Sequence, residues 1–179
     1  MTTVERRVGH VLLITGRPGT GKTTVIRKVA GALAGRRLGG FYTEEIRVRE
    51  ERRGFRLVTF AGGEGVMAHV DHRGPHRVGK YGVDVSLIDE LAESTLAAKE
   101  AADVYLVDEI GKMECLSPRF VAAMRVLLDS RKTVVATIAH QGGGFIAEAK
   151  QRNDVELWEL TQENRDELPA RVLAWLGSG

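Results

Sequence analysis

Residues 15–24, TGRPGTGKTT, place glycine, lysine and threonine at the spacing G-x-x-x-x-G-K-[ST]. The run follows a short apolar stretch and precedes apolar residues at helical spacing, which is the context that a phosphate-binding loop requires. Glycines let successive backbone N–H groups turn toward phosphate oxygens, and a helix N-terminus adds partial positive charge. The residues predicted to bind phosphate are Gly16, Arg17, Pro18, Gly19, Thr20, Gly21, Lys22 and Thr23.

A second group of chemically useful residues lies in VYLVDEIGKME, residues 104–114. An apolar strand that ends in Asp108 is typical of a Walker B aspartate, which holds Mg²⁺ through water beside the loop threonine. We therefore predict Mg²⁺ as cofactor, with Thr23 and Asp108 as the metal-binding residues and Lys22 reaching the β- and γ-phosphates.

Glu109 follows the aspartate directly and is the predicted catalytic base. A glutamate at this position can orient or deprotonate a water opposite the γ-phosphate. Consecutive strand residues face opposite ways, so this role requires both carboxylates to turn toward the site at the strand's end. A solvated glutamate or an ion-pair partner is the alternative.

Other polar residues lie near predicted strand ends. Thr137 or His140, in TVVATIAH, is placed to sense the γ-phosphate or hold the attacking water, although threonine is also an ordinary strand residue. Glu44, in FYTEE, is placed to approach that water, or else lies on the outer face of a half-buried strand.

Hydrolysis also requires positive charge beyond Lys22 and the metal. Lys112 is the preferred candidate because it follows the Walker B strand; the alternative is an exposed lysine paired with Glu114. The remaining candidates are Lys80, Arg152 and Arg165.

Two further patterns favour ordinary structural roles. His69, His72 and His76 lie close together, but their spacing matches none of the usual metal-ligand patterns. The arginines of residues 47–56 are typical of a solvated hairpin tip, although RNA phosphates remain a possible partner.

The composition is that of an ordinary globular protein, with 179 residues, 43% hydrophobic residues and a net charge of +2. The charge does not indicate nucleic acid, and the apolar run near the N-terminus is too short for a signal peptide or a membrane span. The single Cys115 excludes an intramolecular disulfide and fits a reducing compartment. We expect one domain over residues 1–179, without membrane association, as a cytoplasmic monomer.

Apolar runs alternate with helical patterns, which predicts an α/β fold with a mainly parallel sheet and helices on both faces. We expect strands at 10–15, 103–109, 132–140 and 155–161, and helices from Lys22 and at 86–102, 117–130, 144–152 and 163–176. Ser86 and Ser117 are the predicted N-caps of two helices, and Pro169 is expected to bend or delay the last one. Residues 40–61 are predicted to form an antiparallel hairpin inserted into this alternation of strands and helices, followed by a loop at 62–80.

Six segments, in this order and spacing, resemble a known family: GRPGTGKTT, GGFYTEEIR, GFRLVTF, VGKYGVD, VDEIGKME and TQENRDELP. They are similar to the small P-loop nucleoside-triphosphatases first described from thermophiles, whose animal members are called cancer-related NTPase. The resemblance runs from Val11 to about Pro169.

This resemblance implies a RecA-like P-loop fold and Mg²⁺-dependent hydrolysis of several nucleoside triphosphates, with weak base preference. It also implies a second nucleotide-contacting segment at Val104, Tyr105, Leu106, Val107, Asp108, Glu109, Ile110 and Gly111. The chain lacks the guanine-reading motif N-K-x-D, which agrees with a loosely held base. The alternatives are a small-molecule or nucleotide kinase, with the hairpin and the 62–80 loop around an acceptor, and a nucleotide-dependent RNA-associated switch.

Overall fold

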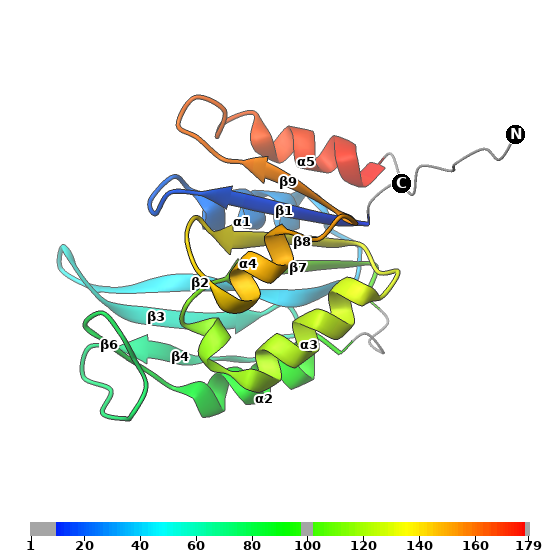
Figure 1. Cartoon of the computed structure of the whole chain (residues 1–179). Coiled ribbons are helices and arrows are strands. Elements are labelled where there is room, and N and C mark those ends of the chain that lie inside the picture. Colours follow the sequence, from blue (N-terminus) through cyan, green and yellow to red (C-terminus); the bar gives the residue numbers. More distant parts are fainter. Residues whose placement is uncertain (1–9, 98–101, 178–179) are drawn as a thin grey trace, which may run out of the picture.

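The computed structural model describes residues 10–97 and 102–177, whose strands form one nine-stranded sheet in the order β5-β6-β4-β3-β2-β7-β8-β1-β9 (Figure 1). The strands are β1 (Val11–Gly16), β2 (Leu38–Val48), β3 (Glu51–Thr59), β4 (Glu64–His69), β5 (Arg77–Val78), β6 (Tyr81–Val83), β7 (Val104–Ile110), β8 (Val134–Ala139) and β9 (Val155–Glu159). The helices are α1 (Lys22–Ala32), α2 (Val85–Thr95), α3 (Pro118–Asp129), α4 (Gly144–Lys150) and α5 (Leu168–Gly177), with a short 3₁₀ helix, η1, at Glu114–Leu116.

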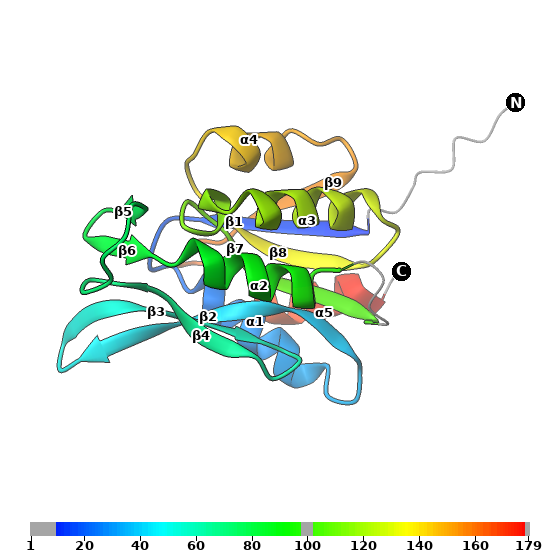
Figure 2. The ribbon, with the colours of Figure 1, turned by 90° about the horizontal axis from the view of Figure 1, so that it is seen from below.

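Helices cover both faces of the parallel part of the sheet, as the sequence predicts (Figure 2). Helices α2, α3 and α4 pack on one face, and α1 and α5 on the other. Alternate residues of β1 supply the two cores: Leu13 packs with the first group of helices, and Leu12 and Ile14 with the second. A parallel strand buried on both faces must be apolar throughout, which explains why these strands were recognisable in the sequence.

The predicted hairpin is present, but it is continuous with the parallel sheet. The first four residues of β2 pair in parallel with β7, from Leu38 opposite Val104 to Phe41 opposite Val107. Beyond them, β2 and β3 form the antiparallel hairpin, with Phe41 opposite Thr59 and Val48 opposite Glu51. One long strand therefore belongs to both parts of the sheet.

The prediction of a loop at 62–80 was wrong. This segment contains β4 and β5, and β4 pairs with β3 and β6. Met67 and Ala68 of β4 are buried in the core, where β4 packs against α2. The glycines, the histidines and Pro75 around them concealed a strand that is stabilised by its neighbours rather than by its own sequence.

Two helix starts show where local sequence decides and where it does not. Ser117 caps α3 as predicted, its Oγ accepting a hydrogen bond from the backbone N–H of Phe120 at 2.9 Å. The predicted cap Ser86 is wrong, because the Asp84 carboxylate accepts from the Leu87 N–H at 3.0 Å. A carboxylate is an equally good cap, so the sequence allowed both.

Three predicted helix lengths also differ from the structure. Helix α2 ends at Thr95, and most of the remaining predicted stretch, residues 98–101, lies outside the described residues. Helix α4 ends at Lys150, two residues before the predicted end. Helix α5 begins at Leu168 rather than at residue 163, so Pro169 lies in its first turn and delays it as expected.

Gly40 is a close-packing point between β2, β7 and α2. Its φ is 92°, and a Cβ there would overlap the carbonyl oxygen of Leu106. Its N–H donates to Thr95 Oγ1 at 3.0 Å, and Thr95 Oγ1 donates to its carbonyl at 2.7 Å. The end of α2 is therefore fixed to the sheet through one glycine.

We predict that Gly40→Ala lowers the free energy of unfolding by more than about 2 kcal/mol, because the methyl group meets backbone that cannot move aside. Gly31→Ala is the control: Gly31 lies on the exposed side of α1 with open space around it, and alanine should add about 0.5–1 kcal/mol. Urea unfolding measures both, and equal stabilities for the two variants would contradict the prediction.

Candidate functional site

The predicted phosphate loop connects β1 to α1 at the carboxyl ends of the parallel strands, where α/β sheets bind ligands. Gly19 and Gly21 have φ values of 81° and 103°, which favour glycine. A Cβ on Gly16 would lie 2.7 Å from the Leu160 carbonyl oxygen and 2.9 Å from Thr20 Oγ1, so this position also requires glycine. Backbone conformation at Gly19 and Gly21, and close contacts at Gly16, thus explain the three glycines of the loop.

Lys22 turns back over the loop. Its Nζ donates to the Gly16 carbonyl at 2.8 Å and lies 3.8 Å from Glu109 Oε2. The outer loop residues Arg17 and Pro18 are exposed. The ammonium group therefore lies between the phosphate loop and the end of β7, with solvent access past the loop.

Asp108 is 1% exposed and is the most heavily hydrogen-bonded carboxylate of this region. Its Oδ2 accepts from Thr23 Oγ1 at 2.7 Å and from Thr43 Oγ1 at 3.2 Å, and its Oδ1 accepts from Thr137 Oγ1 at 2.7 Å. The three hydroxyl groups come from α1, β2 and β8. The structure thus brings Thr23, Asp108 and Thr137 together and adds Thr43, which the sequence analysis missed.

Glu109 faces the same loop as Asp108, although the two are consecutive in β7. The β7–β8 register shifts between Val107 and Ile110, and the Asp108–Glu109 peptide bond is cis. The Glu109 side chain is 31% exposed. Burial raises its pKa, an effect that the Lys22 ammonium opposes. A partly buried carboxylate of raised basicity, open to water, thus lies beside the loop lysine.

Most of the predicted second nucleotide-contacting segment lies inside the protein. Val104, Tyr105, Leu106, Val107 and Ile110 are at most 1% exposed and belong to the two cores. Their side chains alternate between the faces of the sheet, as expected for a central strand. Only the strand end, from Asp108, reaches the loop; the preceding residues position it.

Glu114 is 3% exposed, so the expected alternative in which it pairs with an exposed Lys112 is wrong. A Cβ on Gly111 would lie 2.7 Å from Glu109 Oε1 and 2.8 Å from Glu114 Oε2, which places both carboxyl groups against this glycine. Burial, and next the Glu109 charge, raises the pKa of Glu114 well above its ordinary value. The buried site therefore favours the protonated form of Glu114 more than water does.

The other candidate cations are placed differently. Lys112 is exposed and forms no ion pair within residues 10–97 and 102–177. Arg152 is bound by Asp129 and Asp154 at 2.8 and 2.7 Å. Lys80 lies 3.4 Å from Glu51, and Arg165 lies 3.9 Å from Asp166.

Two further candidates, Glu44 and His140, do not contact the Asp108 cluster. Glu44 lies 3.5 Å from Arg27 on α1. The carbonyl of His140, just past β8, accepts a hydrogen bond from Lys150 Nζ at 2.8 Å. Sequence patterns gave no indication of Lys150, because it lies at the end of an ordinary amphipathic helix.

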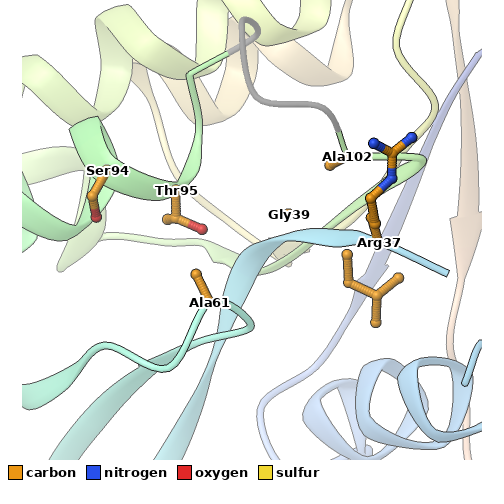
Figure 3. Close-up of a pocket in the computed structure, with 7 residues that line it drawn as sticks. Arg37, Gly39, Ala61, Ser94, Thr95 and Ala102 are labelled. Carbon is orange, nitrogen blue, oxygen red and sulfur yellow. The ribbon is translucent and has the colours of Figure 1, made fainter. Parts of the chain in front are cut away.

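A separate pocket of about 190 Å³ lies at the opposite ends of the strands from the phosphate loop (Figure 3). It is bordered by the first residues of β2, by Ser94 and Thr95 at the end of α2, and by Ala61 and Ala102. The phosphate loop follows the carboxyl end of β1, whereas this pocket lies where β2 and β7 begin. It is not part of the candidate site.

Among the described residues, no group of three or more histidine, cysteine or acidic side chains is arranged to hold a metal. None of the helices described here is long and apolar enough to cross a membrane.

Comparison with known proteins gives the family. The profile of the family described as NTPase matches residues 11–173. The chain belongs to this NTPase family. Nucleoside-triphosphatase THEP1 of Thermotoga maritima is 45% identical over 166 residues, which are 92% of this chain and 94% of that protein. The THEP1 of Methanosarcina barkeri is 36% identical over 165 residues.

Solved structures of NTPase relatives share the fold. The crystal structure of THEP1 from Aquifex aeolicus has a TM-score of 0.83 and 36% identity, covering 93% of this chain and 98% of that one. The solution structure of a human cancer-related nucleoside triphosphatase has a TM-score of 0.79 and 34% identity, with 94% and 97% covered. The predicted α/β P-loop fold and the predicted family are both confirmed.

We predict that Thr137→Val costs about 1–3 kcal/mol of folding free energy, because the buried Asp108 carboxylate loses a hydrogen bond that nothing nearby replaces. Thr24→Val, on the exposed side of α1, is the isosteric control and should stay within about 0.5 kcal/mol of the wild type. Both are measured by urea unfolding. A Thr137→Val protein as stable as its control would show that the hydroxyl is dispensable.

We also predict that Glu114→Gln becomes increasingly stabilising, relative to the wild type, as the pH rises above about 4.5. The folded protein holds the Glu114 proton more tightly than the unfolded chain does. Ionisation of the unfolded chain therefore lowers wild-type stability from the ordinary pKa of 4.5 upward, until the raised pKa is reached. Urea unfolding at several pH values between 4 and 9 tests this, and a pH-independent difference would refute it.

Proposed function

We propose that this chain hydrolyses nucleoside 5′-triphosphates to the diphosphate and phosphate, depends on Mg²⁺ and has weak base preference. The observation that carries the proposal is the convergence of Lys22, Thr23, Asp108 and Glu109 at one point beside the phosphate loop. Membership of the NTPase family, with relatives named nucleoside-triphosphatase, supports the same activity.

The residues present fit a magnesium ion. The Thr23 hydroxyl and the Asp108 carboxylate supply hard oxygen atoms 2.7 Å apart, and Mg²⁺ prefers such ligands. A bound Mg²⁺ would neutralise charge on the β- and γ-phosphates. Thr43 and Thr137 would keep the carboxylate oriented through their own hydrogen bonds to it.

Glu109 is proposed as the residue that orients and deprotonates the attacking water. Its raised pKa makes it a stronger base, and its partial exposure lets water reach it. The Lys22 ammonium, 3.8 Å away, would leave this carboxylate for the phosphates when a nucleotide binds. Release of that ion pair would remove an interaction that lowers the pKa of Glu109 in the free protein.

The remaining predicted contributors surround these residues. Residues Gly16–Thr23 would bind the phosphates through backbone N–H groups, and Gly111 lies close enough to the strand end to join them. Lys112 is proposed as an additional cation that reaches the site from an exposed position. We also infer a single domain over residues 1–179, because all described strands join one sheet, and a cytoplasmic monomer.

Phosphate release from ATP, GTP, CTP and UTP with Mg²⁺, and with no added acceptor, tests the proposal. All four are expected to be hydrolysed. Glu109→Gln should lower kcat by about 10²–10⁴-fold while nucleotide binding persists, since the amide cannot accept a proton. Glu90→Gln, on the exposed side of α2, is the matched control and should remain within about twofold of the wild type.

A wild type that binds nucleotide without releasing phosphate would overturn the hydrolase proposal. Turnover that appeared only with an added hydroxyl compound would favour a kinase, and turnover that required RNA would favour the switch. Full activity of Glu109→Gln would remove Glu109 from the mechanism while leaving the hydrolase proposal intact.

A further inference from the structure

Lys150 is the last residue of α4, and its side chain returns to the end of β8. Its Nζ donates to the His140 carbonyl at 2.8 Å, and the side chain is partly buried. An ammonium group has three donors, so this bond leaves two of them available. The chain thus fixes the position of a lysine ammonium at the carboxyl end of a central strand.

The same arrangement occurs on the adjacent strand. Strands β1 and β8 are parallel neighbours, with Gly16 opposite Ala139, so His140 lies one residue beyond the level of Gly16. Lys22 Nζ donates to the Gly16 carbonyl, as Lys150 Nζ donates to that of His140. Neighbouring strands are about 4.8 Å apart, so the two ammonium groups occupy adjacent positions at the carboxyl ends of the strands, where α/β sheets bind ligands.

These two cations are short of negative charge. Within the described residues, Glu109 is the one carboxylate within 4.0 Å of the Lys22 ammonium, at 3.8 Å. Lys150 has no carboxylate within 4.0 Å in the part of the chain that the structure describes. Burial, and then repulsion from Lys22, lowers the pKa of Lys150. Two ammonium groups held close together, with one neighbouring carboxylate between them in the described structure, form a site suited to a polyanion.

We propose that Lys150 is a catalytic residue that binds the terminal phosphate of the nucleoside triphosphate from within the same chain. The proposal rests on the proposed hydrolase function. Its ammonium would stabilise the negative charge on the γ-phosphoryl oxygens, which other P-loop enzymes neutralise with an inserted arginine.

Lys150 fits this role better than the cations predicted from the sequence. Arg152, two residues further on, is neutralised by two aspartates, and the exposed Lys112 has no hydrogen bond in the described structure that would anchor its ammonium group. Lys150 is already anchored to the strand end next to the loop, so little side-chain freedom is lost on binding.

The test compares Lys150→Met, which removes the charge and keeps an unbranched side chain, with Lys150→Arg, which restores a cation. Two quantities are measured in the full chain: kcat for ATP, and the Kd values of ADP and of a non-hydrolysable ATP analogue by calorimetry with Mg²⁺. Lys28→Met, on the exposed side of α1, is the matched control.

We expect Lys150→Met to lower kcat by about 10²–10³-fold. It should also raise the Kd of the ATP analogue while leaving the Kd of ADP unchanged. Lys150→Arg should recover most of the loss. If Lys150 only held α4 to the His140 carbonyl, the substitution would instead raise the Kd values of ADP and of the analogue equally.

The proposal is overturned if Lys150→Met matches Lys28→Met in kcat and in both Kd values, or if ADP binding falls in parallel with the analogue. The binding measurement also separates this proposal from the hydrolase proposal. If the wild type releases no phosphate, a selective loss of analogue binding in Lys150→Met still supports the phosphate contact. Unchanged selectivity between the analogue and ADP would refute it.

Discussion

The burial of the Asp108 carboxylate constrains the whole of this site. A charge at 1% exposure is costly unless hydrogen bonds replace its lost hydration. Here three threonine hydroxyls supply them, from the start of α1, from β2 and from β8. The central strand β7 is therefore tied to its neighbours on both sides and to the helix that follows the phosphate loop. Any sliding of these elements would leave a buried carboxylate without partners.

Around this carboxylate the charges are arranged in two groups. Asp108 and Glu109 lie at the end of β7 and Glu114 lies just beyond it, whereas the ammonium groups of Lys22 and Lys150 lie at the ends of β1 and β8. A divalent cation suits the first group, and phosphate oxygens suit the second. Because the site is partly buried, each such contact is stronger than it would be in water. The carbonyls of Gly16 and His140 hold the lysines in place before any ligand binds.

Sequence reasoning succeeded where burial is imposed on both faces of a strand. Strands β1, β7 and β8 are apolar at nearly every position, and the helices that cover them show plain 3.6-residue periodicity. It failed for β4 and β5, whose polar, glycine-rich segment acquires its structure by adding to the edge of an existing sheet. The cap of α2 was misplaced for a local reason, since Asp84 and Ser86 are both competent caps.

The sequence by itself determined the phosphate loop, because its glycines, Lys22 and Thr23 act through a contiguous stretch of backbone. It also indicated Asp108 and Glu109, which a recognisable buried strand carries to its end. Only the tertiary structure decided the contacts of Thr43 and Lys150. Thr43 lies 65 residues from Asp108 in the chain, and Lys150 is placed by the return of α4 to β8. Such contacts depend on strand order and helix direction, which no local pattern of residue types encodes.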